Sequence, residues 1–157
     1  MKNFIFEKYL NNDLMNPKYL FHGSPLYLDK VEQRMSNDSN GNEENIDYAV
    51  FLTSSFIIAS AYAFKDKIKK YSKALEWDFE IGGNARTGEI NINFTNVNIP
   101  QNLDGYIYVF YYDESYEHNS ESSIQYKCHK NIKPIDVVKI DFDEFKDYYN
   151  INKHLSK

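Results

Sequence analysis

The stretch Tyr19-Leu20-Phe21-His22-Gly23-Ser24-Pro25 (YLFHGSP) governs the interpretation of this 157-residue chain. Its apolar beginning, residues 19–21, predicts a short strand, and Gly23-Ser24-Pro25 predicts a turn directly after it. A flat ligand can lie against the amide and carbonyl of Gly23, because glycine has no Cβ. His22 can hydrogen-bond a sugar hydroxyl, and Ser24 can donate or accept beside it. The pattern therefore marks His22, Gly23 and Ser24 as candidate ligand-binding residues.

Composition and charge limit the classes of partner. The formal net charge is −5 and the pI about 5.4, so no basic field is expected to hold a nucleic-acid duplex stably. A single cysteine, Cys128, excludes an internal disulfide framework and suits a reducing compartment. The sequence shows no signal-peptide pattern and no apolar run of membrane-spanning length, so we expect a cytoplasmic protein without a membrane partner. The histidines at positions 118, 129 and 154 are too widely spaced to predict a metal site.

Apolar periodicity predicts one α+β domain, residues 1–157, with mostly antiparallel strands. A helix within residues 1–14 should end near Asn16-Pro17, and Ser54 or Ser55 should cap a helix over residues 56–71. A terminal helix is expected within residues 142–155, with the carboxylates of 141–147 on its solvated face. Residues 36–45 and 113–122 are expected to be loops, 26–31 a turn or brief helix, and 82–84 a turn. The predicted strands are 19–21, 48–53, 76–81, 90–99, 106–111, 123–128 and 135–140.

Three features follow one another along the chain. His22-Gly23-Ser24 ends a strand, a strand-to-helix unit carries Phe51 and Tyr62, and a late strand begins at Gln125-Tyr126. This order resembles the diphtheria-toxin and poly(ADP-ribose) polymerase branch of the ADP-ribosyltransferase superfamily. YLFHGSP, YAVFLTSSFIIASAYAF and IKPIDVVKI look like small bacterial and phage proteins with a Tyr-His-Gly-Ser-Pro opening. The resemblance spans about residues 19–140 and implies a split antiparallel β-sheet core with flanking helices, whose cleft binds NAD as the substrate.

The resemblance also implies roles for individual residues. His22 would orient a ribose hydroxyl of NAD, the backbone of Gly23 would pair with the nicotinamide carboxamide, and Ser24 fills the third position of the triplet. Tyr62 and Phe51 would stand where two aromatic rings hold the nicotinamide. Arg34 follows the triplet at a distance from which it could meet the pyrophosphate of the cofactor.

The sequence departs from the family at its catalytic carboxylate. Where the family has a glutamate at the start of the late strand, this chain has Gln125. An amide can bond a ribose hydroxyl, but it gives a developing cation no negative charge, and losing such a contact costs about a hundred- to a thousand-fold in rate. Three consequences stay open: a transferase with little glycohydrolase activity, a nucleotide-binding protein without chemistry, or a carboxylate from the preceding loop. Glu121, four residues before Gln125, is the first candidate for that carboxylate, with Glu117 and Glu114 behind it.

The leading hypothesis is transfer of ADP-ribose from NAD to a macromolecular acceptor, protein or nucleic acid. The alternative is a non-catalytic nucleotide-binding or regulatory module of the same fold. An RNA 2′-phosphotransferase ranks third, because such an enzyme needs several arginines for its phosphate and this chain has only Arg34 and Arg86.

Overall fold

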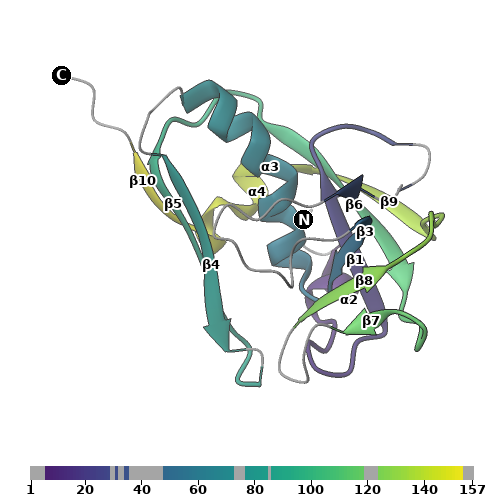
Figure 1. Ribbon diagram of the computed structural model, residues 1–157. Helices are drawn as coiled ribbons and strands as arrows, with labels where there is room; N and C mark the ends of the chain where they lie inside the picture. The colour runs from purple at the N-terminus through teal and green to yellow at the C-terminus, as the bar shows by residue number, and fades with distance from the viewer. Residues whose placement is uncertain are drawn as a thin grey trace.

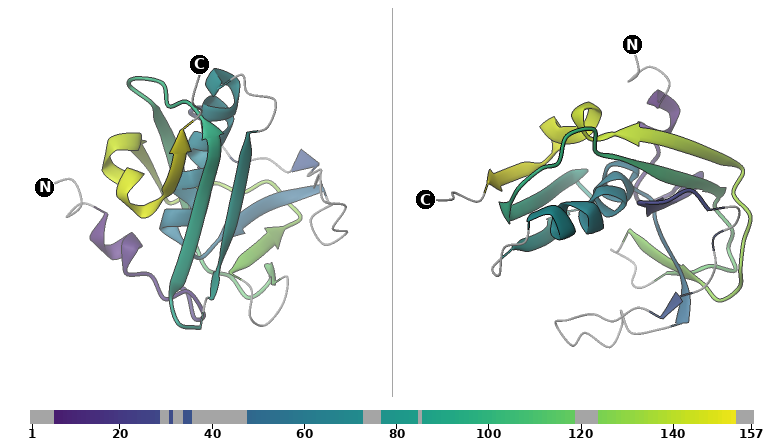
Figure 2. Two further views of the ribbon diagram at one scale, coloured as in Figure 1. Left: turned by 90° about the vertical axis from the view of Figure 1, so that its left-hand side faces the viewer. Right: turned by 90° about the horizontal axis from the view of Figure 1, so that it is seen from above.

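The computed structural model describes residues 6–28, 31, 34–35, 48–72, 77–84, 86–118 and 124–153. These residues form an α+β structure in which helix α3 (Phe56–Ser72) lies between two sheets (Figure 1; Figure 2). The predicted α+β class is thus confirmed. Within the described ranges, no helix combines the length and apolar character needed to cross a membrane.

The larger sheet is antiparallel throughout, in the order β7-β8-β3-β1-β6-β9, with β2 paired to β3. β1 pairs with β6 along its whole length, from Tyr19↔Tyr111 to Ser24↔Tyr106. With β3 it shares one pair of Cα partners, Phe21↔Thr53, so β1 and β3 separate beyond Phe21. The strands are β1 (Tyr19–Ser24), β2 (Arg34–Met35), β3 (Tyr48–Thr53), β6 (Asp104–Tyr111), β7 (Glu117–His118), β8 (Gln125–Cys128) and β9 (Asp136–Asp141).

The smaller sheet has the order β10-β5-β4, built from β4 (Asp78–Asn84), β5 (Glu89–Val97) and β10 (Asn150–Lys153). The turn predicted at residues 82–84 is wrong, because both glycines continue β4 and pair with β5. The chain reverses after Asn84, whose carbonyl accepts the amide of Thr87 at 3.2 Å. Gly88, at φ +79°, supplies the left-handed conformation that this reversal requires.

Two glycines of the larger sheet allow helix α3 to pack directly against it. A Cβ on Gly23 would lie 1.9 Å from the carbonyl oxygen of Ala59, and a Cβ on Gly105 would lie 2.9 Å from the Cβ of Ala63. The two alanines are four residues apart and therefore share one helix face. The helix begins as predicted, since the Ser55 hydroxyl accepts the amide of Ile58 at 3.1 Å. Small residues on both elements thus let the helix backbone contact the sheet directly.

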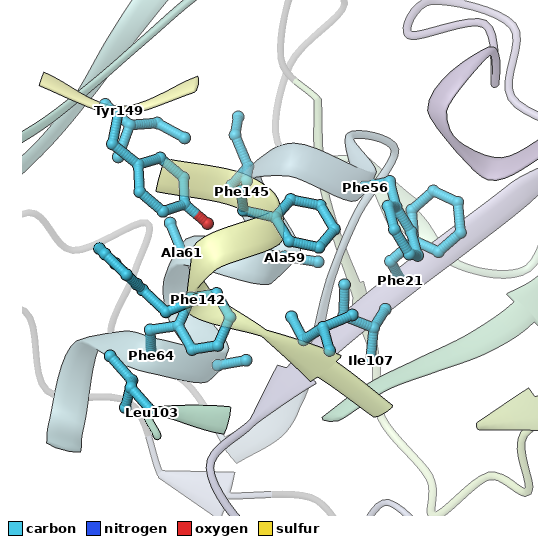
Figure 3. Packing of buried hydrophobic residues seen from close by; sticks show 14 of the residues in the cluster. Phe21, Phe56, Ala59, Ala61, Phe64, Leu103, Ile107, Phe142, Phe145 and Tyr149 are labelled. Carbon is cyan, nitrogen blue, oxygen red and sulfur yellow. The ribbon is translucent and has the colours of Figure 1, made fainter. Parts of the chain in front are cut away.

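Helix α3 is apolar on both sides in its first half, as Figure 3 shows. Toward the larger sheet, Phe56 meets Phe21 edge to face with ring centroids 5.2 Å apart. Elsewhere on the helix, Phe64 meets Phe142 at 5.4 Å. The opposite face of the larger sheet carries a second apolar cluster, formed by Leu20, Val31, Val50, Leu52, Tyr108, Phe110, Tyr126 and Cys128.

The predicted terminal helix over residues 142–155 is wrong beyond its first turns. Helix α4 covers Phe142–Phe145, a 3-10 turn covers Lys146–Tyr148, and the chain then extends as β10, parallel to β5. Phe142, Phe145 and Tyr149 have helical spacing, and a short helix followed by a strand buries all three equally well. Asp141 and Glu144 form a capping box at the start of α4, and both are half-buried, so these two carboxylates do not belong to a fully solvated face.

The N-terminal helix is also shorter than expected, because helix α2 covers only Glu7–Leu10 in the described residues. The side chain of Asn12 organises the chain beyond it. Its Nδ2 donates to the carbonyls of Tyr19 and Ser54, both at 2.9 Å, and its Oδ1 accepts the amides of Lys18 and Tyr19 at 3.2 and 3.1 Å. These bonds tie the N-terminal segment to the starts of β1 and α3.

Three smaller predictions have different outcomes. The His-Gly-Ser triplet lies inside β1, which runs to Ser24, so the predicted turn begins only at Pro25. Strand β7 occupies part of the predicted loop 113–122. The predicted loop 36–45 lies outside the described residues.

Candidate functional site

His22 lies at the point where β1 and β3 separate. Its Nδ1 is 2.9 Å from the carbonyl oxygen of Phe51. A carbonyl oxygen only accepts, so Nδ1 carries the proton in this bond and a neutral ring presents Nε2 as an acceptor. The Nε2 atom is shielded from solvent. The imidazole therefore bridges the two strands where their backbones pair no further.

Gly23 has a packing role in this structure. Its missing Cβ makes room for the backbone of Ala59 and for the amide nitrogen of Ala63, which would lie 2.9 Å from a Cβ at this position. The sequence predicted a ligand against this glycine, whereas the face of Gly23 toward α3 is filled by the helix. On its other edge, Gly23 has no Cα partner in β3.

Ser24 shapes the turn that follows. Its hydroxyl donates to the carbonyl of Leu26 at 2.8 Å and accepts the Leu26 amide at 3.2 Å. The hydroxyl of Tyr108 donates to the same carbonyl at 3.3 Å and accepts the amide of Leu28. Ser24 is buried, with 3% of its surface exposed. These contacts give Ser24 a structural role in the turn that follows β1.

Strand β8 brings Gln125 into the same sheet, next to β3. Gln125 pairs with Thr53, which itself pairs with Phe21, so these three residues share the face that carries α3. His22 alternates to the other face, where its ring centroid lies 6.4 Å from that of Tyr108. The structure thus places His22 and Gln125 on strands flanking β3, with their side chains leaving opposite faces.

Tyr62 lies on α3 and its ring packs toward the smaller sheet. It meets Phe79 of β4 edge to face at 5.7 Å and 70°. The ammonium of Lys65 lies 5.4 Å from the centre of the Tyr62 ring and 5.6 Å from that of Phe79, a cation–π arrangement. Phe51 is half-buried on β3. The two aromatic residues of the predicted sandwich therefore belong to different layers.

The remaining predicted residues are only partly described. Arg34, on β2, pairs through its backbone with Ala49 of β3, and its side chain is not described. Glu121 lies outside the described residues. Glu117, a candidate for the same role, stands on β7 opposite Lys127, with 59% of its side chain exposed. Glu114 is exposed in the turn before β7.

Sequence reasoning missed Lys127. It is the second residue after Gln125, is opposite Phe51 in register, and is only 7% exposed. The alternation of the strand sequence Gln-Tyr-Lys-Cys puts Lys127 on the face of Gln125, and that signal was available in the sequence.

On the other face of β8, the ring of Tyr126 stacks on that of His118 with centroids 4.3 Å apart. Burial raises the pKa of Tyr126, and Tyr112 adds to the rise.

Two surface hollows lie near the ends of α3. One, of about 450 Å³, is lined by Tyr71, Ser72, Asn98, Ile99 and Lys153. The other, of about 250 Å³, lies between the N-terminal segment, the start of α3 and β5, and its lining includes Tyr9, Asn12, Ser55, Phe56 and Ile90. Neither is lined by His22, Gly23, Tyr62 or Gln125.

Comparisons with protein-family models, with curated proteins and with solved structures found no match to this chain.

Proposed function

We propose that the protein binds NAD where β1 and β3 separate and slowly transfers its ADP-ribose to a macromolecular acceptor. The observation that carries this proposal is the bond from His22 Nδ1 to the Phe51 carbonyl, which fixes the imidazole at that opening. The strand order puts β1 and β8, which carry His22 and Gln125, on either side of β3, and the two side chains leave opposite faces of that sheet. NAD is proposed as the substrate because the sequence motifs resemble those of the ADP-ribosyltransferase superfamily.

The reaction breaks the bond between the nicotinamide nitrogen and the ribose C1′. Nicotinamide leaves as a neutral base with the bonding electrons, C1′ becomes cationic, and a nucleophile of the acceptor attacks it and loses a proton. Hydrogen bonds from the protein position the ribose for this step. Gln125 can bond a ribose hydroxyl but leaves the cation without a negative partner, so transfer should be about a hundred- to a thousand-fold slower than with a carboxylate.

The experiment incubates the purified protein with NAD labelled in its adenylate part and a cell lysate. His22→Asn is the informative variant, because an asparagine Nδ2 can donate to the Phe51 carbonyl in place of Nδ1 while nothing replaces Nε2. We expect label on macromolecules with the wild type, and its loss in both His22→Asn and His22→Ala. His22→Asn should keep its melting temperature. Full labelling by either variant would contradict a role for the imidazole in NAD binding.

Gln125→Glu tests the position of the late strand. A carboxylate beside the ribose should raise NAD hydrolysis by up to about a hundredfold. Gln101→Glu, at an exposed position in the turn before β6, makes the same chemical change away from the site and should leave hydrolysis unchanged. Unchanged hydrolysis in Gln125→Glu would show that Gln125 does not contact the ribose.

The packing of Tyr62 against Phe79 favours a second candidate function. With that ring engaged by the smaller sheet, the nicotinamide loses one wall of its predicted sandwich, and nucleotide binding without turnover becomes the alternative. NAD would then raise the melting temperature, with no nicotinamide released and no label transferred.

A further inference from the structure

The turn after strand β1 exposes two large apolar side chains. Leu26 is 64% exposed and Tyr27 is 61% exposed, and exposed apolar patches mark interaction surfaces. The backbone of this turn is nevertheless fixed, because the hydroxyl of the buried Tyr108 donates to the Leu26 carbonyl at 3.3 Å and accepts the Leu28 amide. The Ser24 hydroxyl adds two further bonds to the backbone of Leu26. A well-anchored turn therefore presents Tyr27 to solvent.

Tyr106 of β6 forms an aromatic pair with Tyr27. Their ring centroids lie 5.7 Å apart and their planes meet at 73°. In register, Tyr106 is opposite Ser24 of β1 and opposite Lys139 of β9. Because alternate residues of a strand share a face, Ser24 and its partner Tyr106 lie on the sheet face of His22. The exposed surface of such rings can stack a nucleobase of any kind, since every base has a π-face.

Lys139 supplies a positive charge next to this aromatic pair. Its side chain is 60% exposed, and its ammonium lies 3.6 Å from Oδ2 of Asp104. Asp104 has a nearer partner in Lys67, whose ammonium lies 2.9 Å from Oδ1. Asp141, which is opposite Asp104 in register, accepts an amide of α4 in its capping box. An exposed ion pair of this kind contributes little, so little is lost when the Lys139 ammonium turns to a phosphate.

We infer that Tyr27 and Tyr106 stack a nucleobase and that Lys139 contacts the phosphate of the same nucleotide. The inference goes beyond the proposed transfer, because it requires neither His22 nor Gln125 nor the breaking of a bond. A nucleotide combines a flat ring with a negative charge, and the aromatic pair and the lysine match these two properties. The nucleotide can belong to a dinucleotide such as NAD or to a single-stranded nucleic acid, and the experiment separates these sources.

Titration of the full chain with AMP and with adenosine, followed by NMR chemical shifts of backbone amides, tests the inference. We expect the wild type to bind AMP about two- to fivefold more tightly than adenosine, the range for an exposed ion contact. Tyr27→Ala should weaken binding of both by about five- to a hundredfold, the range for a lost stacking partner. Tyr27→Phe keeps the ring and should retain most of the affinity. Tyr71→Ala, at another exposed tyrosine near the end of α3, is the matched control and should change nothing.

Lys139→Met tests the phosphate contact separately from stacking. It should abolish the preference for AMP over adenosine and leave the affinity for adenosine unchanged. Lys146→Met is the matched control, because the Lys146 ammonium is also exposed and lies 3.7 Å from Asp143, and it should keep the preference. NAD and a single-stranded oligodeoxyadenylate then compete with AMP. Displacement by NAD assigns the aromatic pair to a dinucleotide, and displacement by the oligonucleotide assigns it to a nucleic acid.

Four results would overturn the inference: no saturable shifts with AMP in the wild type, equal affinity for AMP and adenosine, wild-type affinity in a folded Tyr27→Ala, or displacement of AMP by neither competitor. If Tyr27→Ala does not fold, Tyr27→Leu takes its place, since leucine keeps an apolar side chain against Tyr106 without a ring. None of these results decides the proposed transfer, which is measured by the labelling of macromolecules in the His22 variants. A failure of labelling would equally leave AMP binding to be judged by its own titration.

Discussion

Replacing Gly23 by alanine should disrupt the packing of helix α3 against the larger sheet. The added Cβ would lie 1.9 Å from the carbonyl oxygen and 3.0 Å from the carbonyl carbon of Ala59. These are backbone atoms within a 17-residue helix, so no side-chain rotation can relieve the contact. Either α3 moves away from β1 or the strand bends, and both loosen the packing around Phe21 and Phe56.

The size of the effect follows from the kind of contact. Forcing an extra methyl group into a packed core typically costs about 1–3 kcal/mol, and a clash with backbone lies at or beyond the upper end, at about 3 kcal/mol or more. For a domain of this size, that loss lowers the melting temperature by roughly 6–12 °C. Gly105→Ala meets mainly the Cβ of Ala63, at 2.9 Å, and should cost less, about 1–3 kcal/mol.

Urea denaturation followed by circular dichroism measures these differences. Gly82→Ala is the matched control, because a Cβ on this exposed strand glycine meets no atom within 4 Å. It should be neutral or stabilising by up to about 1 kcal/mol. If Gly23→Ala unfolds at the same urea concentration as the wild type, the direct seating of α3 on β1 is wrong, and a ligand is left as the reason for a glycine at this position.

Two further predictions concern stability. Asn12→Ala removes four hydrogen bonds to backbone groups and should cost roughly 2–4 kcal/mol; urea titration should show no comparable loss in the exposed Asn11→Ala. Burial raises the pKa of Tyr149, and the bond to the Ser60 hydroxyl opposes the rise, so the folded state holds the phenol proton more tightly than the unfolded state. This contribution is fully present below about pH 10 and is lost above it, with a slope of about 1.4 kcal/mol per pH unit. Tyr149→Phe should flatten the alkaline fall in the free energy of unfolding, and an equally steep fall would refute the assignment to Tyr149.

Local sequence signals sufficed for the β3–α3 unit. The run from Tyr48 to Thr53 is a strand as predicted, and the helix predicted over residues 56–71 extends one residue further, to Ser72. Both depend on neighbouring residues: an apolar run of strand length, then serines that can cap a helix, then an apolar helix face. Ser55 caps the helix, whereas the hydroxyl of Ser54 donates to the carbonyl of Leu14.

Elements whose conformation depends on residues far away in the sequence were predicted poorly. Residues 150–153 form a strand because β5, some sixty residues earlier, presents an edge to them, and Asn150 pairs with Asn93. The early end of helix α2 depends on Asn12, whose amide reaches Ser54. No local pattern announces such contacts.

The same contrast between local sequence signals and long-range contacts applies to the candidate site. The sequence predicted His22 and Gln125 as site residues, but the neighbouring order of β1, β3 and β8 becomes visible only in the assembled sheet. Gly23 was interpreted through a ligand, and the structure adds a helix contact that no spacing rule predicts. The burial of Lys127 depends on what covers its strand, so alternation gives its face but not its burial.

The position of α3 between the sheets has a consequence for how the protein opens. Ala59 of the helix contacts the larger sheet at Gly23, while the helix also contacts β5 of the smaller sheet. Neither sheet can separate from α3 without exposing an apolar surface of the helix to water. The two sheets should therefore unfold together, as one cooperative unit. Amide protons of α3 from Ala59 onward, where the Ala59 amide donates to the Ser55 carbonyl at 3.1 Å, should then exchange with deuterium only through global unfolding, at the slowest rate among the described residues.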